Sequence, residues 1–363
     1  MAILILFLVS CASKETIPFA DKEIKEKYHA DELKKYFEGL YDLEHPGFSY
    51  LISKNGKIIV SGGVGAANIE EKTPNNTKTI FRVASITKQF TAVSILQLAE
   101  SGKLSVNDSL AKYYPNLPNA EKITIRNLLN HTSGMWEQEN DDQFPFPIDE
   151  LVSEQEHLSY IQKNGVFFEP GEKWRYCSNG YFVLGLIVEK VSGLSLASYM
   201  EKNIFAPLGM KNTGLYDASV KNDHSAIGYG VTEDKPYKEI NVNMATYNGA
   251  AALDSTVEDL FIWNEALHNG KLINEASYKE AITPYEFTNG FIPFVGYGFG
   301  LGIEPVGGHN TIGHPGQMKG FHSDILRLPD DDINIILLSN MNNYQFKVKW
   351  RFSEKIINIM FQE

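Results

Sequence analysis

The chain has 363 residues, of which 43% are hydrophobic and 21% charged, the composition of a folded globular protein rather than of a disordered or repetitive chain. Its length exceeds what one hydrophobic core usually serves and predicts two domains, or one domain folded as two lobes. The formal charge of −12 argues against nucleic acid as a partner, and the two cysteines, Cys11 and Cys177, are too few for a disulfide scaffold.

The N-terminus predicts export. Residues 1–9 form an uninterrupted apolar run, too short for a membrane-spanning helix of about 20 residues but typical of a signal peptide. The run ends at Cys11 in Leu-Val-Ser-Cys, which resembles a bacterial lipobox. We therefore expect residues 1–10 to be a signal peptide and Cys11 to carry a lipid that holds the protein at the cell envelope. No Lys or Arg precedes the run, and a buried strand with an inert thiol is the alternative.

The first third of the chain predicts a helix, a hairpin and a second helix. After a tether from residue 11, residues 21–40 repeat apolar side chains at helical spacing and predict an amphipathic surface helix. Residues 48–54 and 57–60 are prone to form strands and meet at Asn55-Gly56, a strong hairpin signal. Residues 85–101 predict a helix that Gly102 closes.

The rest of the chain predicts a helical region followed by more sheet. The middle third contains short helical stretches and a nearly all-apolar helix over 181–191, which we expect to be buried. A helix over 255–268, strands over 297–303, 321–328 and 333–338, and a helix over 348–360 follow. The expected fold class is α+β: an α/β lobe with an antiparallel sheet, about 41–82 and 245–363, interrupted by a mainly helical lobe, about 83–244. A crevice between lobes is a common place for a site.

Ser85 and Lys88 form the pattern Ser-x-x-Lys at the start of the helix over 85–101. Residues three apart lie on one helical face, so the two side chains can reach each other. A lysine kept neutral by burial can take the proton of the serine and make it a nucleophile. The pattern occurs again at Ser109 and Lys112 in a polar stretch, where we interpret it as a solvated pair near a helix end.

Longer stretches resemble the class C β-lactamase and penicillin-binding serine hydrolase family. They are FRVASITKQFTA from Phe81, ITIRNLLNHTSGM from Ile123, FEPGEKWRYCSNGYFVLG from Phe168, NIFAPLGMKNTG from Asn203 and IGHPGQMKGF from Ile312. Their order and spacing also resemble that family. The resemblance implies a β-lactamase/transpeptidase-like fold, a catalytic domain over 41–363 and chemistry without a cofactor.

The resemblance also assigns the family's second motif, Tyr-x-Asn. Its tyrosine corresponds to Tyr176, which would shuttle a proton between Ser85 and the leaving group. The third position holds Ser178, and Asn179 stands one place late, so both are candidate substrate-binding residues. Without Ser85, a core aromatic beside Trp174 would be the better interpretation of Tyr176. Tyr114 begins a second match, which the adjoining proline marks as a turn.

The third motif, Lys-Thr-Gly in many β-lactamases, corresponds to His314, Pro315 and Gly316. We expect His314 and Gly316 to contact substrate, and the backbone N–H groups of Gln317 and Ser85 to form the oxyanion hole that the resemblance implies. A neutral histidine offers a substrate carboxylate only a hydrogen bond at pH 7, so His314 is expected to disfavour β-lactams and to make activity depend on pH near neutrality. A surface histidine in a turn is the alternative.

Other enzyme classes have no support. Gly-x-Ser-x-Gly and the nucleotide phosphate loop are absent from the sequence, and His309, His314 and His322 lack metal-ligand spacing, so we assign no metal. The sequence predicts a serine hydrolase that cleaves a D-amino-acid peptide or amide, an ester or a β-lactam, with specificity in loops such as 136–148. The rival is a non-catalytic relative that binds peptidoglycan fragments or a protein. The acyl donor and the oligomeric state stay open.

Overall fold

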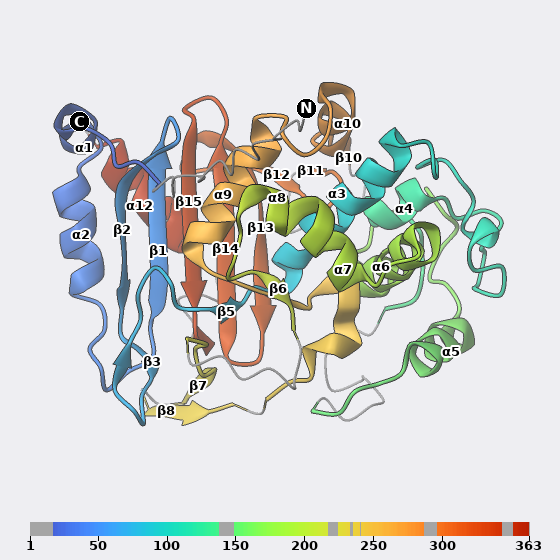
Figure 1. Ribbon diagram of the computed structural model, residues 1–363, viewed down its shortest axis with the longest axis horizontal. Coiled ribbons are helices and arrows are strands. Elements are labelled where there is room, and N and C mark those ends of the chain that lie inside the picture. Colours follow the sequence, from blue (N-terminus) through green and yellow to red (C-terminus); the bar gives the residue numbers. More distant parts are fainter. Residues whose placement is uncertain are drawn as a thin grey trace, which may run out of the picture.

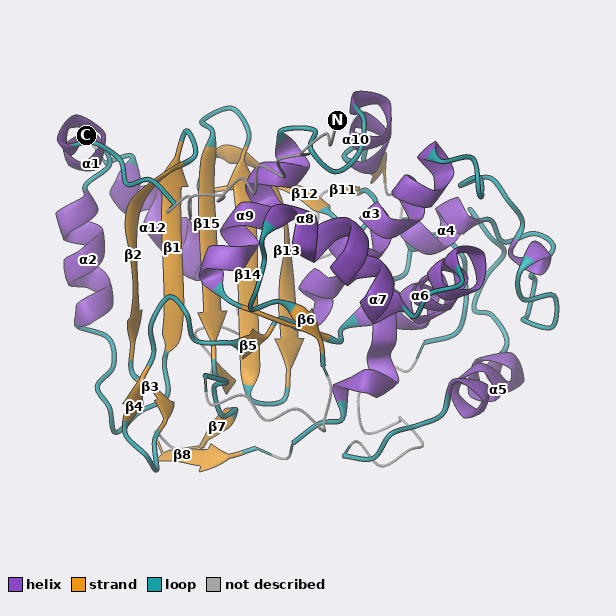
Figure 2. Cartoon of the chain, viewed as in Figure 1, coloured by secondary structure: helices purple, strands orange, loops and turns teal. Residues whose placement is uncertain are grey.

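The computed structural model describes residues 17–137, 149–216, 224–232, 235–239, 241–286, 296–342 and 351–362. Its centre is an eight-stranded sheet in which all neighbouring strands are antiparallel (Figures 1 and 2). In spatial order the strands are β10 (Tyr285–Glu286), β11 (Gly296–Tyr297), β12 (Gly302–Val306), β13 (His309–Met318), β14 (Phe321–Leu328), β15 (Ile333–Ser339), β1 (Phe48–Lys54) and β2 (Lys57–Val64).

The sheet joins the two ends of the chain. β1 pairs with β2 through the predicted Asn55-Gly56 turn and with β15 on its other edge, where Phe48 lies opposite Ser339. Side chains alternate across β1: Tyr50 and Ile52 belong to the core on one face, and Leu51 belongs to the core on the other. Both faces are therefore buried, and each needs a layer of helices.

The first helical layer consists of α1 (Lys22–Lys27), α2 (Ala30–Glu38) and α12 (Arg351–Met360). Phe37 of α2 stacks on Tyr50 with ring centroids 4.1 Å apart. The single helix expected over 21–40 is wrong, because His29 adopts φ +53° and breaks it into two. A left-handed residue cannot continue a right-handed helix.

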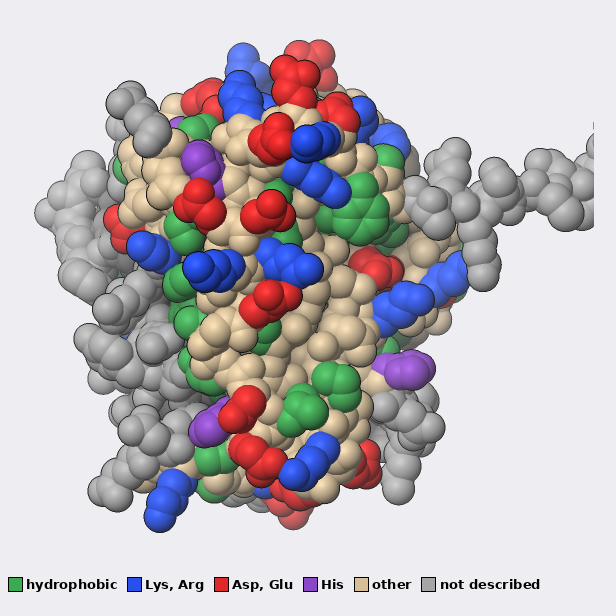
Figure 3. Space-filling model, turned by 90° about the vertical axis from the view of Figure 1, so that its left-hand side faces the viewer, with side chains coloured by type: hydrophobic (Ala, Val, Ile, Leu, Met, Phe, Trp, Pro, Cys, Tyr) green, Lys and Arg blue, Asp and Glu red, His purple; other side chains and the backbone are tan. Residues whose placement is uncertain are grey.

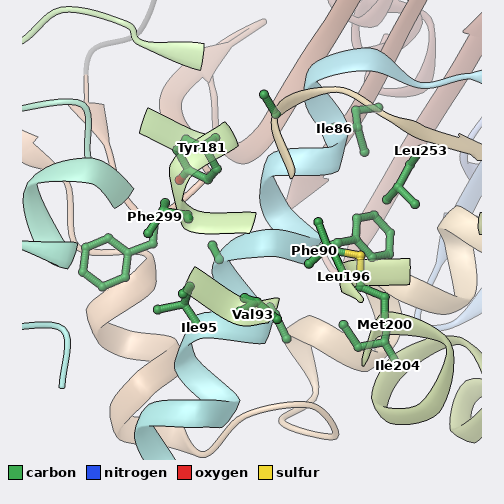
Figure 4. Packing of buried hydrophobic residues seen from close by; sticks show 14 of the residues in the cluster. Ile86, Phe90, Val93, Ile95, Tyr181, Leu196, Met200, Ile204, Leu253 and Phe299 are labelled. Atoms are coloured by element: carbon green, nitrogen blue, oxygen red, sulfur yellow. The ribbon is translucent and has the colours of Figure 1, made fainter. Parts of the chain in front are cut away.

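The second layer packs on the opposite face of the sheet. It contains α9 (Val257–His268), α3 (Thr87–Glu100) and α6 (Ser178–Ser192), whose apolar side chains share one core with Leu51, Ile325 and Ile336 of the sheet. In Figure 4, Phe90 and Val93 of α3 lie among Leu196, Met200 and Leu253. The nearly all-apolar helix predicted in the middle third is α6, and it is buried as expected.

The remaining elements extend the helical lobe and frame the site. The helical ones are η1 (Ala84–Ile86), η2 (Leu110–Lys112), α4 (Ile125–Leu129), α5 (Glu154–Asn164), α7 (Leu196–Met200), the π-helical turn η4 (Glu201–Phe205), α8 (Ala206–Leu208), η5 (Met244–Ala250) and α10 (Glu275–Ala281). The short strands are β3 (Ala66–Asn68), β4 (Thr73–Pro74), β5 (Phe81–Arg82), β6 (Gly214–Leu215), β7 (Tyr229–Thr232), β8 (Lys235–Lys238), β9 (Leu253–Ser255) and β16 (Met341–Asn342). Figure 1 shows the helical lobe beside the sheet.

The strands and helices of the C-terminal part follow the prediction with one exception. β14, β15, α9 and α12 lie where the sequence predicts them. The strand expected over 297–303 is instead two strands, β11 and β12, joined by a turn in which Gly300 has φ +71°. The two-lobed α+β architecture agrees with the expected fold class.

The face that carries α1 and α2 is covered by interspersed acidic and basic side chains (Figure 3). Ion pairs one helical turn apart, such as Lys22–Glu26 and Lys34–Glu38, contribute to this pattern. Among the described residues, no single helix is both long and apolar enough to cross a membrane, although α6 and the segment Leu196–Leu208 pass that test together as a bent pair.

Candidate active site

Ser85 lies in η1, directly ahead of α3. The residue before it, Ala84, has φ +46°, which is rare for a residue with a side chain and costs about 1–3 kcal/mol. The Thr87 hydroxyl holds this turn, because it donates to the Ala84 carbonyl (2.6 Å) and accepts the N–H of Leu253 (3.0 Å). The strained backbone thus sets the direction of the serine side chain at the start of the helix.

Lys88 lies one turn after the serine and is fully buried. Its ammonium nitrogen Nζ is 3.2 Å from Ser85 Oγ, 3.4 Å from Ser178 Oγ and 3.0 Å from the Ala250 carbonyl. Burial lowers the pKa of Lys88 to about 7. A substantial fraction of these side chains is therefore neutral at pH 7 and able to accept a proton from the serine.

Glu137 is a part of the site that the sequence analysis missed. One carboxylate oxygen, Oε2, accepts the backbone N–H of Asn179 (2.8 Å) in the first turn of α6. Burial raises the pKa of Glu137, and the attraction between Glu137 and Lys88 opposes the fall in the lysine pKa. The only sequence signal was its place just after the HTSGM segment, which carries no local motif for a carboxylate.

Tyr176 brings its ring close to the lysine, with Nζ of Lys88 4.7 Å from the ring centroid. Burial raises the pKa of Tyr176, while an interaction with the Ser85 hydroxyl works in the opposite direction. The phenol is therefore protonated at neutral pH and suited to donate a proton. Trp174 is also near, with ring centroids 6.5 Å apart, so the tyrosine belongs to an aromatic cluster as well as to the site.

Ser178 and Asn179 begin α6 but lie in different surroundings. Ser178 faces Lys88, as its 3.4 Å contact shows. Asn179 is placed differently from the prediction: it is buried, its amide nitrogen donates to the Trp136 carbonyl (2.9 Å) and its amide oxygen pairs with His157 (2.9 Å). Both ends of this amide are hydrogen-bonded inside the protein. Asn179 therefore links α6 to Trp136 and His157 rather than facing a substrate.

His314 lies in β13 and is buried, so the alternative of a surface turn is wrong. Its Nδ1 is 2.6 Å from the Pro315 carbonyl, which can only accept, so Nδ1 carries the proton. Its Nε2 lies 2.9 Å from the hydroxyl of Tyr297 and in the neutral ring accepts from it. Both nitrogens are engaged within the protein, which differs from the expected direct hydrogen bond to substrate.

Gly316 and Gln317 lie where β13 runs beyond its partner. The pairing of β13 with β12 ends at Gly313. The rest of β13 has η1 packed beside it instead. A side chain on Gly316 would put its Cβ 2.1 Å from the Val83 carbonyl oxygen. The glycine therefore admits the backbone that leads into Ser85, in the space that we expect from the sequence to be open to substrate. Gln317 has an exposed side chain, opposite His322 in β14.

The second copies of the Ser-x-x-Lys and Tyr-x-Asn patterns have only local structural contacts. Ser109 caps η2 and Lys112 pairs with Asp108 (2.8 Å), as expected for the second Ser-x-x-Lys copy. Tyr114 packs under Lys190, whose Nζ is 4.7 Å from its ring centroid. The predicted lipid anchor Cys11 and residues 138–148 of the specificity loop lie outside the described residues. Among those that are described, no three His, Cys, Asp or Glu side chains gather as metal ligands.

Comparisons with known proteins find a matching family and relatives over most of the chain. The profile of the Beta-lactamase family matches residues 33–355. A penicillin-binding protein of Bacillus subtilis strain 168 is 31% identical over 327 residues, which cover 85% of this chain and 71% of the relative. A putative penicillin-binding protein of the same organism is 30% identical, with 91% and 78% covered.

Solved structures share the fold. A penicillin-binding protein from Bacillus halodurans superposes with a TM-score of 0.75 at 27% identity, covering 90% of this chain and 98% of that one. The D-amino acid amidase from Ochrobactrum anthropi SV3, complexed with L-phenylalanine amide, superposes with a TM-score of 0.77 at 23% identity, covering 93% and 96%.

Proposed function

Because this chain belongs to the β-lactamase family of serine hydrolases, we propose that it is an exported hydrolase that cleaves an amide or ester through an acyl-enzyme on Ser85. The observation that carries the proposal is the 3.2 Å contact between Ser85 Oγ and Nζ of Lys88. A buried amine with a pKa of about 7, in contact with a serine at a helix start, is the arrangement that makes a serine nucleophilic.

Acylation uses Lys88 as the base. Neutral Lys88 takes the proton of Ser85 while Oγ bonds to the substrate carbonyl carbon, and the negative charge moves to the carbonyl oxygen. Backbone N–H groups of Ser85 and Gln317 stabilise that oxygen. As the carbon–nitrogen or carbon–oxygen bond breaks, Tyr176 donates its proton to the leaving group and regains one from charged Lys88. Water then attacks the ester in the same way and restores the free serine.

The substrate is an amide or ester of a D-amino acid without a free carboxylate, rather than a β-lactam. Lysine in the third motif would give a fixed cation for a substrate carboxylate, whereas His314 has both nitrogens engaged by Tyr297 and Pro315. The similarity to a D-amino acid amidase supports the amide class. Side-chain specificity then depends on the surroundings of Trp136 and on the loop that follows it.

The test is a labelling and turnover panel on purified protein lacking residues 1–11. A fluorophosphonate should label Ser85, as mapped by mass spectrometry, and Ser85→Ala should abolish labelling and turnover. Ser109→Ala, in the second Ser-x-x-Lys pattern, is the matched control and should retain both. The panel compares D- and L-phenylalanine amide, a p-nitrophenyl ester and a cephalosporin. Labelling at another residue would contradict the role of Ser85, and a folded protein that turns over none of these substrates would support the non-catalytic rival.

Export and lipid anchoring through Cys11 are the second part of the proposal. Their support is the apolar run over 1–9 followed by Leu8 to Cys11. One acyl chain gives only marginal membrane binding, so stable anchoring requires the several chains of a bacterial lipoprotein. Cys11→Ser should release the protein from membranes. A mature protein that retains Met1 and carries no lipid mass would rule the anchor out.

A further inference from the structure

His131 holds the main chain on both sides of Tyr176. Its carbonyl oxygen accepts the N–H of Arg175 (3.0 Å), and its ring nitrogen Nδ1 accepts the N–H of Cys177 (3.2 Å). Arg175 and Cys177 are the two neighbours of Tyr176 in the chain. One residue from the turn after α4 therefore fixes the backbone immediately before and immediately after the tyrosine.

The hydrogen bond to Cys177 also defines the protonation state of the His131 ring. A backbone N–H can only donate, so Nδ1 must be unprotonated and the neutral ring carries its proton on Nε2. The ring is fully buried, and Nε2 has no hydrogen-bond partner among the described residues. Burial lowers the pKa of His131 well below its usual value, and the charge of protonated Lys88 acts in the same direction. Nδ1 therefore stays an acceptor at neutral pH.

The ring of His131 packs against two tyrosines that also contact each other. Its centroid lies 4.4 Å from that of Tyr176 and 4.6 Å from that of Tyr297, with the planes inclined by 45° and 46°, and the two tyrosine centroids are 6.3 Å apart. Tyr297 in turn contacts His314 through its hydroxyl. The imidazole thus limits the movement of the Tyr176 ring on the side that faces His131.

The backbone at His131 is strained. Its φ of +62° lies in the left-handed region, which is uncommon for residues other than glycine, although asparagine, aspartate and histidine adopt it more often than the rest. The following residue, Thr132, holds the turn, because its N–H donates to the Asn127 carbonyl (2.9 Å) and its own carbonyl accepts the N–H of Gly171 (2.8 Å). Such strain persists where the surroundings over-determine it, and it concentrates at functional sites.

We propose that His131 is a positioning residue for Tyr176: it fixes the main chain and the ring of the tyrosine so that the phenol stays beside Ser85. In this role it acts through Tyr176 and touches neither the substrate nor the reacting atoms. Its kinetic consequence rests on the proposed function, whereas the placement of Tyr176 can be measured without any turnover.

Two variants separate the two contacts. His131→Asn keeps an acceptor oxygen close to the position of Nδ1 and tolerates the left-handed backbone, but it loses the ring. His131→Phe keeps an aromatic ring and loses the acceptor. His268→Phe is the matched control, because His268 also packs against a tyrosine, with its ring 5.5 Å from that of Tyr278 in another part of the core.

The kinetic test uses a p-nitrophenyl ester. His131→Phe should lower kcat by about tenfold to a hundredfold with KM nearly unchanged, as expected when general acid catalysis is impaired, and His131→Asn should lower it less. In the Tyr176→Phe background, His131→Phe should change kcat by less than about twofold, because the phenol to be positioned is gone. An equal loss in both backgrounds would show a merely structural role and overturn the inference.

The second readout does not depend on activity. With 3-fluorotyrosine placed at position 176, the ¹⁹F resonance should be single and narrow in the wild type and with His268→Phe, and broadened or split with His131→Phe. An unchanged spectrum overturns the inference. If the spectrum responds but the wild type turns over no substrate, the proposed function fails and the positioning inference stands. Should His131→Phe not fold, His131→Asn carries both tests through the loss of the ring.

Discussion

The hydroxyl of Tyr297 and Nε2 of His314 lie 2.9 Å apart in a buried hydrogen bond. Because the Pro315 carbonyl fixes the proton of the neutral ring on Nδ1, the tyrosine is the donor to Nε2. The third motif of the site is thus anchored by a residue in β11, which is separated from β13 in the sheet only by β12.

Tyr297→Phe should destabilise the protein, because it leaves Nε2 of His314 buried without this donor. The expected loss is about 1–3 kcal/mol in the free energy of unfolding, the usual cost of an unsatisfied buried polar group. Urea denaturation followed by tryptophan fluorescence measures it. Tyr237→Phe, at a tyrosine that is 49% exposed, is the control and should change stability by less than about 0.5 kcal/mol. Equal effects of the two substitutions would contradict the role assigned to the buried bond.

Activity should fall as the pH drops below about 7, because Lys88 must be neutral to accept the proton of Ser85. Burial lowers the lysine pKa to about 7, so kcat/KM for a neutral ester should fall about tenfold per pH unit on the acid side. The buried phenol of Tyr176 has a raised pKa and stays protonated well above neutrality. A pH profile of kcat/KM from about 5 to 9 tests this, and a rate that is flat across this range would exclude Lys88 as the base.

Glu137→Gln should move the acid limb of that profile to lower pH. The charge of Glu137 raises the pKa of Lys88, so its removal should lower the lysine pKa. Glutamine keeps an oxygen that can accept the Asn179 N–H, which preserves the start of α6. Glu169→Gln, at an exposed pair with Lys122, is the control and should leave the profile unchanged. A shift to higher pH would refute this electrostatic role.

Lys88→Met should stabilise the protein while abolishing its activity. A pKa lowered from 10.5 to about 7 corresponds to roughly 5 kcal/mol of unfavourable burial of the charge at neutral pH. In the variant, the Ala250 carbonyl and Ser85 lose their hydrogen bonds to the lysine, and this loss cancels about 1–3 kcal/mol of the gain. The net gain in unfolding free energy should be about 2–4 kcal/mol.

The pH dependence of this gain identifies its cause. Between about pH 7 and 10.5 the unfolded chain holds the lysine proton and the native protein does not, so wild-type stability rises with pH across this window. The advantage of Lys88→Met should therefore shrink as pH rises. Exposed Lys103→Met should show neither effect. Urea denaturation at pH 7 and pH 9.5 measures both effects. The prediction is wrong if Lys88→Met is less stable than the wild type at pH 7.

Gly316→Ala should impair both stability and catalysis. The added Cβ would lie 2.1 Å from the Val83 carbonyl and 2.3 Å from Ser323 Oγ, so the turn that carries Ser85 must shift. Overpacking of this kind costs about 1–3 kcal/mol. Gly214→Ala, with open space around its Cβ, is the matched control. Calorimetry measures the stability of the two variants, and the rate of fluorophosphonate labelling measures the reactivity of Ser85. The prediction is wrong if Gly316→Ala and Gly214→Ala have the same effects.

Several features followed from the sequence because they depend on neighbours along the chain. The Asn55-Gly56 turn sets the hairpin of β1 and β2. Ser85 and Lys88 meet because a helix places residues three apart on one face. The all-apolar pattern of α6 marked it as buried.

The surroundings of the nucleophile were decided by the tertiary structure. Glu137 and His131 reach the site through turns whose paths no local pattern specifies, and Tyr297 comes from β11, two strands away from β13 in the sheet. Which of Ser178 and Asn179 faces the lysine depends on the rotation of α6 about its axis.

Local spacing thus determined the contact between Ser85 and Lys88 and the strand and helix types, since helix and strand periods act over a few residues. The pKa of Lys88, the engagement of His314 and the need for glycine at 316 depend on burial and on contacts between segments distant in the chain. Those are properties of the packed protein, because the free energy of a charge or a hydrogen bond depends on what replaces water around it.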